Sequence, residues 1–209
     1  MFRSLQRAAS GFVINTTRGS IKMKFRADAA PETVKHMEKI IKSGKYSEEK
    51  LPPGHLPKFY NGNIVQKQWT NFHSLTDRRV LNCGVYGSNP KTVEEPFNNK
   101  WPSCDFNNKE PTEELQVNES GTEPRISNLR GTVSMFHWDQ RHSKGDTEFF
   151  INLANNNFLD EGYGGFCVFA GIEDEESYQI MDAIAAELTG DYNVEGSFEH
   201  PVKSIELMD

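Results

Sequence analysis

The sequence predicts a mainly β fold, in which short antiparallel strands close into a barrel capped by two α-helices. Several short apolar runs alternate with polar residues or stand between turn residues, as strands do, while only two segments carry apolar residues at helical spacing. The expected order is strand, strand, helix, several strands, helix and strand, without a strand–helix–strand alternation. Such an order favours a closed antiparallel sheet over a parallel one.

The first elements are a hairpin over residues 11–26 and a helix over residues 31–43. Two apolar runs flank the turn residues 17–20, and the second run alternates apolar and polar side chains. Pro31 suits the first position of a helix, and apolar residues recur at helical spacing after it. Gly44 is a natural stop, so we expect the helix to end there.

The rest of the chain is expected to hold one more helix and five more strands. Four consecutive acids, from Glu173 to Glu176, open the predicted helix and complement its dipole. The predicted ranges are residues 173–188 for the helix and 79–85, 132–136, 148–153, 165–171 and 201–208 for the strands.

Two long irregular segments interrupt what we interpret as a single domain over residues 11–209. Turn residues, such as Pro52-Pro53-Gly54, break any element between residues 47 and 71. Residues 86–125 form a long polar stretch with repeated prolines. Structureless loops of this length are uncommon inside a domain unless they are functional or disordered. We therefore interpret residues 86–125 as a surface insertion with partner binding as its candidate role.

Composition excludes several classes of function. The chain has 209 residues, a formal net charge of −7 and a sequence pI near 5.4, whereas a nucleic-acid binder is expected to carry a basic stripe. No window approaches about 18 apolar residues, so we expect no membrane span. Cys83, Cys104 and Cys167 are far apart and lack metal-ligand spacing, which argues against a zinc site or a disulfide framework and fits a reducing compartment. We expect no cofactor.

The first ten residues leave the cellular location open. They contain Arg3 and Arg7 but no acid, and Phe2, Leu5 and Ala9 share a helical face. This pattern is typical of a mitochondrial import sequence, and an ordinary basic tail is an equal interpretation. We expect a mitochondrial location, with a cytoplasmic one as the alternative.

Several motifs, in the right order, resemble those of the cyclophilins, the barrel-type peptidyl-prolyl cis-trans isomerases. The similar segments are residues 17–21, residues 30–34, residues 130–135 followed by 148–151, and residues 158–160 followed by Tyr163 and Phe166. The spacing of the family is kept, apart from a short extra stretch between Met135 and Phe149. The resemblance implies a closed eight-stranded barrel with two helices, and it leaves the two long loop insertions unexplained.

The resemblance also implies a pocket that acts on X–Pro peptide bonds. Rotation about such a bond meets a barrier of about 20 kcal/mol, so a catalyst needs an apolar slot for the proline ring and a donor that favours the twisted amide. In this family the donor is an arginine. The resemblance assigns the ring-binding floor to Phe150, Phe158, Leu159 and Tyr163, for which ordinary barrel core is the alternative interpretation.

The arginine is missing from the position where the resemblance expects it. The ungapped match of residues 72–84 to the family's phenylalanine-histidine-arginine strand places Ser74 there, and a rival match places Lys67 there. Neither side chain offers a guanidinium fork. The ungapped match also puts Arg79 in place of an apolar floor residue, and this side chain would have to swing into the pocket to substitute.

The expected peptide-binding residues follow from these matches, and the catalytic residue stays unassigned. They are Val80, Asn82, Phe136, His137, Phe150, Phe158, Leu159 and Tyr163. Phe136 and Trp138 are bulky where the family uses small residues, which predicts a crowded groove. His137, Asp139 and His142 suggest a metal, but no further ligand is placed, and we prefer to interpret them as an exposed polar loop without metal.

Three functions are compatible with the sequence. The preferred hypothesis is a cyclophilin-like protein with a degenerate proline-binding pocket that serves as a structural or interaction subunit of a larger assembly. The alternative is an active peptidyl-prolyl isomerase that assists protein folding, and a third is a module that binds proline peptides without turnover. The missing arginine, the crowded groove and the insertions favour the first. The expected partners are proline-containing peptides or protein subunits.

Overall fold

The computed structural model describes residues 8–43, 49–50, 67–86, 115–137, 145, 148–187 and 202–209. Within the strands at 49–50, 67–71, 73–75 and 85–86 it describes the backbone alone. Most of the expected basic tail and most of the two expected insertions lie outside the described residues.

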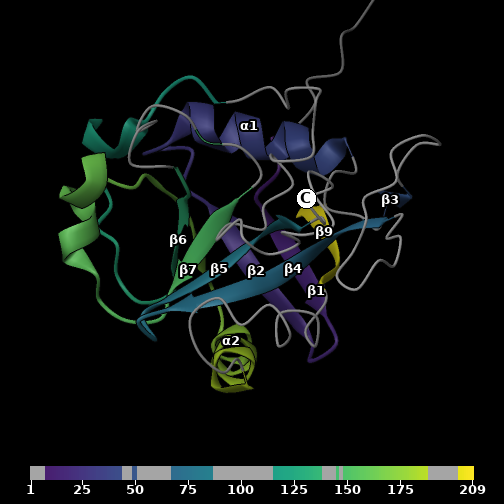
Figure 1. The fold of residues 1–209 in the computed structure, drawn as a ribbon. Coiled ribbons are helices and arrows are strands. Elements are labelled where there is room, and N and C mark those ends of the chain that lie inside the picture. Colours follow the sequence, from purple (N-terminus) through teal and green to yellow (C-terminus); the bar gives the residue numbers. More distant parts are fainter. Residues whose placement is uncertain are drawn as a thin grey trace, which may run out of the picture.

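The fold is mainly β, with one antiparallel sheet curled around a core and two helices at opposite ends of it (Figure 1). Neighbouring strands are hydrogen-bonded in the order β3-β4-β5-β7-β6-β8-β2-β1-β9. The strands are β1 (Gly11–Thr16), β2 (Ser20–Phe25), β3 (Glu49–Lys50), β4 (Lys67–Thr76), β5 (Val80–Tyr86), β6 (Thr132–Met135), β7 (Phe149–Asn152), β8 (Val168–Ile172) and β9 (Val202–Met208).

The expected closure into an eight-stranded barrel is not confirmed. In the described part of the chain β9 pairs with β1, β4 pairs with β3 and β5, and no ladder joins β4 to β9. The order instead contains nine strands, although β4 and β9 lie beside each other in the curled sheet. What the structure confirms is the mainly β architecture with an antiparallel sheet and two helices.

Both helices form where the apolar spacing predicts them. They are α1 (Pro31–Lys42) and α2 (Glu175–Glu187). α1 starts at Pro31, as expected, and its buried side chains face the sheet. In Figure 1 the two helices lie at the top and the bottom of the sheet, which leaves its curved outer side free for the segments between the strands.

The start of α1 is capped by a residue that is distant in sequence. Ala30, at the cap position, provides no side-chain hydrogen bond. The buried carboxylate of Glu119 instead accepts hydrogen bonds from Glu32 N at 3.1 Å, Thr33 N at 2.8 Å and Thr33 Oγ1 at 2.7 Å. Because Glu119 belongs to the expected surface insertion 86–125, this is a correction: the end of that segment packs into the domain.

β4 begins inside the segment that we expected to be irregular, residues 47–71. The ladder with β5 starts at Trp69 and Tyr86 and continues through Thr70 and Asn71. Local pattern gives no strand signal here, because β-pairing depends on the neighbouring strand more than on the segment itself. The irregular segment therefore ends before Lys67, earlier than the sequence predicts.

A tight turn joins β4 to β5 and uses two residues with left-handed backbone. Asp77 has a φ of 50° and Arg78 a φ of 54°, and Arg79 N donates a hydrogen bond to Thr76 O at 2.9 Å. Two successive left-handed residues match the twist of a two-residue hairpin loop, for which Asn-Gly is the usual sequence. The turn delivers Arg79 to the start of β5.

Aromatic side chains fill the inside of the curled sheet. The ring of Phe12 contacts those of Phe25, Phe149 and Phe169, with centroid separations of 5.3, 6.0 and 6.2 Å. Burial of one such side chain contributes about 1.5–3 kcal/mol to folding. Further fully buried side chains of this core are Ile14, Ile21, Met23, Met37, Phe72, Leu81 and Ile151.

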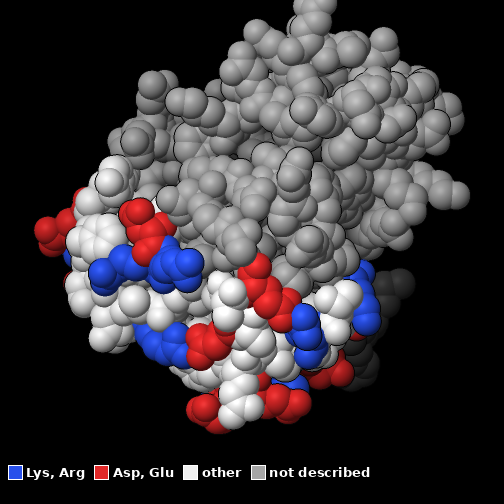
Figure 2. Space-filling model, turned by 60° about the horizontal axis from the view of Figure 1, so that its bottom comes forward, with Lys and Arg blue, Asp and Glu red and all other residues white. Residues whose placement is uncertain are grey.

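Charges of both signs alternate on the face turned forward in Figure 2, and several are paired. β2 contacts the segment before α2 through Lys22 and Asp174 at 3.8 Å and through Lys24 and Glu173 at 3.3 Å. This described surface therefore shows mixed charge rather than a basic stripe. No helix among the described residues is long and apolar enough to cross a membrane.

Candidate functional site

The outer side of strands β5, β7 and β6 carries the candidate site. Side chains alternate along β7, so Phe149 and Ile151 enter the main core while Phe150 and Asn152 lie on the opposite side. Phe150 and Asn152 are buried as well, because residues 156–166 cover the outer side of the strand. This covering segment contains the short helices η4 (Asn157–Asp160) and η5 (Gly162–Gly164), drawn in green at the left of Figure 1.

A second apolar cluster, separate from the main core, lies under the covering segment. We call it the outer cluster; its buried members are Phe150, Leu159 and Phe166, and Val80 and Phe136 pack against it while remaining partly exposed. The rings of Phe150 and Phe166 meet edge to face at 5.3 Å. Four of the residues predicted for the peptide site, Val80, Phe136, Phe150 and Leu159, are thus brought together on one apolar surface.

Two more predicted residues form an exposed aromatic rim beside the outer cluster. Phe158 is 55% exposed and Tyr163 is 58% exposed, whereas Phe166 in the same covering segment is buried. Tyr163 has a φ of 56°, a left-handed conformation that is rare for a bulky residue. Its ring centroid lies 6.4 Å from that of Phe166. Exposed rings held in a strained backbone are typical of binding surfaces.

Arg79 lies at this rim and is held in place by the covering segment. Its Nε donates to Asn156 Oδ1 at 2.8 Å, and its Nη2 donates to the Asn155 carbonyl at 2.9 Å. The guanidinium carbon is 5.8 Å from the ring centroid of Phe158, within cation–π range. In the described structure the Arg79 guanidinium therefore sits over the ring of Phe158 and is held there by two amide oxygens.

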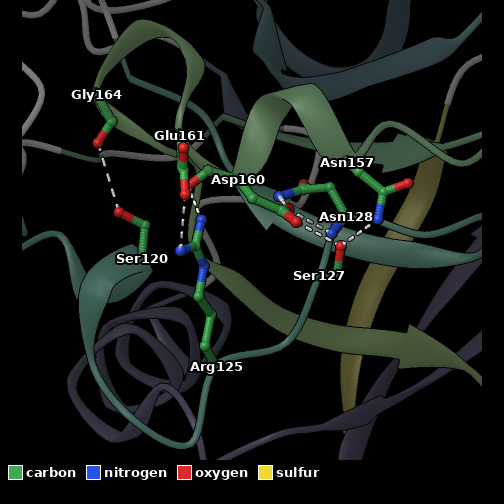
Figure 3. Close-up of polar contacts among 8 residues, drawn as sticks. All are labelled: Ser120, Arg125, Ser127, Asn128, Asn157, Asp160, Glu161 and Gly164. Atoms are coloured by element: carbon green, nitrogen blue, oxygen red, sulfur yellow. Dashed lines mark hydrogen bonds and ion pairs between the residues drawn. The ribbon is translucent and has the colours of Figure 1, made fainter.

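A buried chain of amides ties Arg79 to the rest of the domain. Asn156 Nδ2 donates to Asn152 Oδ1 at 2.8 Å, and Asn152 Nδ2 donates to Asn128 Oδ1 at 3.1 Å. Asn128 in turn donates through N and Nδ2 to Asp160 Oδ1, at 2.8 and 2.9 Å (Figure 3). Because a side-chain amide both donates and accepts, the chain satisfies these buried groups and fixes their orientation.

Asp160 anchors the other end of this network. Burial alone would raise the pKa of its carboxyl, but hydrogen bonds from Ser127 and Asn128 and the charge of Arg125 outweigh burial, so the pKa lies below its ordinary value of 3.8. Arg125 also donates to the Asp160 carbonyl and lies 3.8 Å from Glu161 (Figure 3). The hydrogen bonds of this carboxylate therefore hold the covering segment against residues 127 and 128.

His137 takes a structural position under the rim. Its ring stacks on Phe166 at 4.3 Å, and it is only 5% exposed. Nε2 lies 2.8 Å from the Gly165 carbonyl, and since a carbonyl only accepts, Nε2 carries the proton in this hydrogen bond. Of the predicted metal candidates, Asp139 and His142 lie outside the described residues, as does Trp138. Within the described part no group of three metal-ligating side chains occurs.

The strand register decides which candidate for the missing arginine lies near the cluster. Ser74 pairs with Asn82, and Asn82 pairs with Phe150, so these backbone positions form one row across β4, β5 and β7. Lys67 pairs instead with Lys50 at the far end of β4. Asn82 is buried and its Nδ2 donates to Thr76 Oγ1 at 3.0 Å. The backbone of Ser74 is therefore in register with that of Phe150, whereas Lys67 lies at the other end of β4.

Phe166 was not among the peptide-binding residues expected from the sequence, and Asn156 and Asn128 had no expected role in the site. Phe166 belongs to a motif that the resemblance uses, but its contact with Phe150 depends on how the covering segment folds back. The run of asparagines at 155–157 predicts only a turn. The contact between Asn156 and Arg79 joins residues 77 positions apart, so no local signal in the sequence reveals it.

The two described cysteines are buried and free of disulfides. Burial raises the pKa of the Cys83 thiol far above its ordinary value, and burial raises the pKa of Cys167 to about 11. Neither is a nucleophile at neutral pH, because the thiolate is the reactive form. Cys104 lies outside the described residues.

Comparison with known proteins covers nearly the whole chain. The family model described as "Cyclophilin type peptidyl-prolyl cis-trans isomerase/CLD" matches residues 12–207. Peptidyl-prolyl cis-trans isomerase B of Escherichia coli is 28% identical over 184 residues, which is 84% of this chain and 84% of that protein. Peptidyl-prolyl cis-trans isomerase A of Dickeya dadantii is 27% identical over 177 residues, 83% of this chain and 70% of that protein.

Solved structures agree with these relatives in fold. Two crystal structures of a Cryptosporidium parvum cyclophilin type peptidyl-prolyl cis-trans isomerase superpose with TM-scores of 0.60 and 0.62 at 15% identity. The matches cover 95% and 96% of this chain and 99% and 98% of those chains. One of the two structures was determined in the presence of the dipeptide Ala-Pro. At this identity the likeness concerns the fold alone.

Proposed function

This chain belongs to the family of cyclophilin-type peptidyl-prolyl cis-trans isomerases, and we propose that it is a degenerate member that holds proline-containing segments of a partner protein instead of turning them over efficiently. The observation that carries the proposal is the Arg79 guanidinium, which is held over Phe158 by Asn155 and Asn156. Because these contacts hold the guanidinium, we expect that it does not swing across Phe150, where we propose that the twisting amide binds.

The outer cluster supports the binding half of the proposal. Phe150 and Leu159 form a buried apolar floor, while Val80 and Phe136 remain partly exposed above it. A pyrrolidine ring is small, rigid and apolar, so it gains free energy from contact with such a surface and loses little conformational entropy on binding. The exposed rings of Phe158 and Tyr163 provide further contact area at the edge.

The backbone row of Ser74, Asn82 and Phe150 supports the second part of the proposal, which is that turnover is weak. A rotamase lowers the barrier by donating a hydrogen bond to the twisted amide, and one such donor is worth roughly a hundred- to a thousandfold in rate. The backbone of Ser74 pairs with Asn82, which pairs with Phe150, and serine is a short neutral donor. We therefore expect binding to survive and turnover to be weak.

The experiment is a titration of the isotope-labelled protein with a short proline peptide, read by amide chemical shifts. We expect saturable shifts at Val80, Phe150, Leu159 and Phe166, and none with a matched peptide in which alanine replaces proline. Phe158→Ala, at an exposed rim position, is expected to weaken binding without unfolding the protein. Shifts confined to another surface, or equal responses to both peptides, would overturn the binding site.

The rival function is an active isomerase that assists protein folding, and the names of the curated relatives favour it. The two functions share the binding step and differ only in turnover. A measurable rate therefore decides between them, whereas affinity for proline peptides does not.

We further propose that the protein acts within a larger assembly and that residues 1–10 direct it to mitochondria. Support comes from the exposed rings of Phe158 and Tyr163, since exposed apolar surface is typical of interaction sites, and from the basic, acid-free composition of the first ten residues. Native size separation of mitochondrial and cytosolic fractions tests both parts. A free monomer, or enrichment in the cytosol, would contradict them.

A further inference from the structure

We propose that Arg79 and Phe158 form a subsite for the carboxylate of an acidic residue next to the bound proline, so that the site selects acidic proline segments. This inference rests on the proposed binding of proline segments and adds the class of segment that is bound. It follows from three observations: the guanidinium is fixed, its hydrogen-bond partners among the described residues are neutral, and it lies at the edge of the outer cluster.

The guanidinium of Arg79 is fixed in orientation. Nε and Nη2 are held by Asn156 Oδ1 and the Asn155 carbonyl, and the ring of Phe158 lies 5.8 Å below. Asn156 is itself fully buried and held by the amide chain that runs to Asp160. An arginine that is already immobilised loses little side-chain entropy when it binds an anion, which strengthens the resulting contact.

The charge of Arg79 is not neutralised within the described part of the chain. Its hydrogen-bond partners are neutral amide oxygens, whereas Arg125 lies near Glu161 and Arg130 contacts Asp182. The nearby carboxylate of Asp160 is occupied by Ser127, Asn128 and Arg125. A guanidinium with unused N–H groups, exposed to solvent, binds carboxylates better than other common side chains do.

The subsite adjoins the place proposed for the proline ring. Arg79 precedes Val80, and Phe158 precedes Leu159, and the second residue of each pair belongs to the outer cluster. Since an extended chain advances about 3.3–3.6 Å per residue, a side chain within two residues of the proline reaches the rim. The methylene groups of a glutamate would lie on the exposed Phe158 ring, with the carboxylate toward Arg79.

The expected size of the preference for glutamate over glutamine follows from the kind of ion pair, which is exposed to solvent but has a fixed arginine. Because the pair is open to solvent, we expect a glutamate peptide to bind about three- to tenfold more tightly than its glutamine counterpart at low salt. The preference should shrink as ionic strength rises, because salt screens exposed charges.

The test is a peptide series in which a single Glu or Gln is placed at each position from two before to two after the proline. Each Glu/Gln pair is titrated onto wild type, Arg79→Gln, Arg79→Lys and Arg78→Gln. Arg78→Gln is the matched control, since Arg78 is the adjacent exposed arginine and makes the same change in net charge. Melting temperatures confirm that each variant is folded.

We expect a Glu preference at one position or at adjacent positions, its loss in Arg79→Gln, its partial retention in Arg79→Lys and its full retention in Arg78→Gln. Proline-dependent binding with equal Glu and Gln affinities in wild type would overturn the subsite while leaving the proposed function standing. A preference that Arg78→Gln removes equally would also overturn it, as a general charge effect. If no proline peptide binds at all, the proposed function fails, and the subsite with it. If Arg79→Gln does not fold, the wild-type Glu preference is measured at rising ionic strength. A preference that does not shrink with salt would overturn the subsite.

Discussion

At the scale of single residues, the turn before Arg79 carries backbone strain. Arg78 adopts a φ of 54° without an adjacent glycine, and its side chain is exposed. The left-handed region costs a residue with a side chain about 1 kcal/mol, whereas glycine enters it freely. The local sequence Asp-Arg is therefore a poor match to a turn that normally uses Asn-Gly.

Arg78→Gly is accordingly expected to stabilise the protein by about 0.5–1 kcal/mol, because glycine removes this strain. Chemical denaturation followed by circular dichroism measures the free energy of unfolding. Arg78→Ala serves as the control and should give no gain, since alanine keeps the Cβ that causes the strain. A gain of equal size in both variants would show that the charge of Arg78, not its backbone, is the cause.

Asp160 gives a second residue-scale prediction, in the pH dependence of stability. Its folded pKa is lowered below 3.8, so the stability it contributes is fully present above the unfolded pKa and is lost as pH falls through the folded pKa. Replacing the carboxylate by an amide removes this contribution. The free-energy difference between wild type and Asp160→Asn should therefore be constant above about pH 5 and shrink below about pH 4.

Urea denaturation of both proteins between neutral pH and pH 3 measures this difference. Other carboxylates with lowered pKa values, such as Asp174, are present in both proteins and cancel in the comparison. A difference that stays the same down to pH 3 would show that the hydrogen bonds of Asp160 do not depend on its charge.

At the scale of elements, α1 depends on a cap that its own sequence does not supply. Glu119→Ala leaves Glu32 N and Thr33 N without their acceptor at a buried helix start, so we expect a loss of about 2–3 kcal/mol. Glu176→Ala, in the exposed first turn of α2, should cost less than about 1 kcal/mol. Thermal unfolding of both variants compares them, and equal losses would refute the capping role.

An element could be predicted when its signals lie within its own segment of the sequence, and not when it depends on a distant partner. The first hairpin and both helices follow from periodicity and from turn residues such as Gly19 and Pro31, because those signals are local. The start of β4 at Lys67 and the packing of Glu119 could not be predicted, since both depend on partners far along the chain. The same holds for the closure of the barrel, which the pairing of β4 and β9 would have to supply.

At the scale of the whole molecule, some residues of the candidate site could be predicted from local motifs, and others depend on contacts between distant parts of the chain. The floor residues Phe150 and Leu159 were predicted because the family motif fixes their place on the chain, and they meet in the outer cluster. The direction of Arg79 was not predictable, because it is set by Asn156, a residue 77 positions away, and by the amide chain behind it. Motifs thus indicate the fold and the apolar floor, and long-range hydrogen bonds decide the polar part of the site.

The central claim is that the fold retains a proline-binding surface while its catalytic donor is gone. The most direct measurement is a protease-coupled proline isomerisation assay of wild type, Ser74→Arg and Ser74→Gln. We predict a wild-type kcat/KM at least about a hundredfold below that of an ordinary cyclophilin, a gain of about tenfold or more in Ser74→Arg, and no gain in Ser74→Gln. A wild-type rate within about tenfold of an ordinary cyclophilin would contradict the account, because a donor worth more than that would then still be in place.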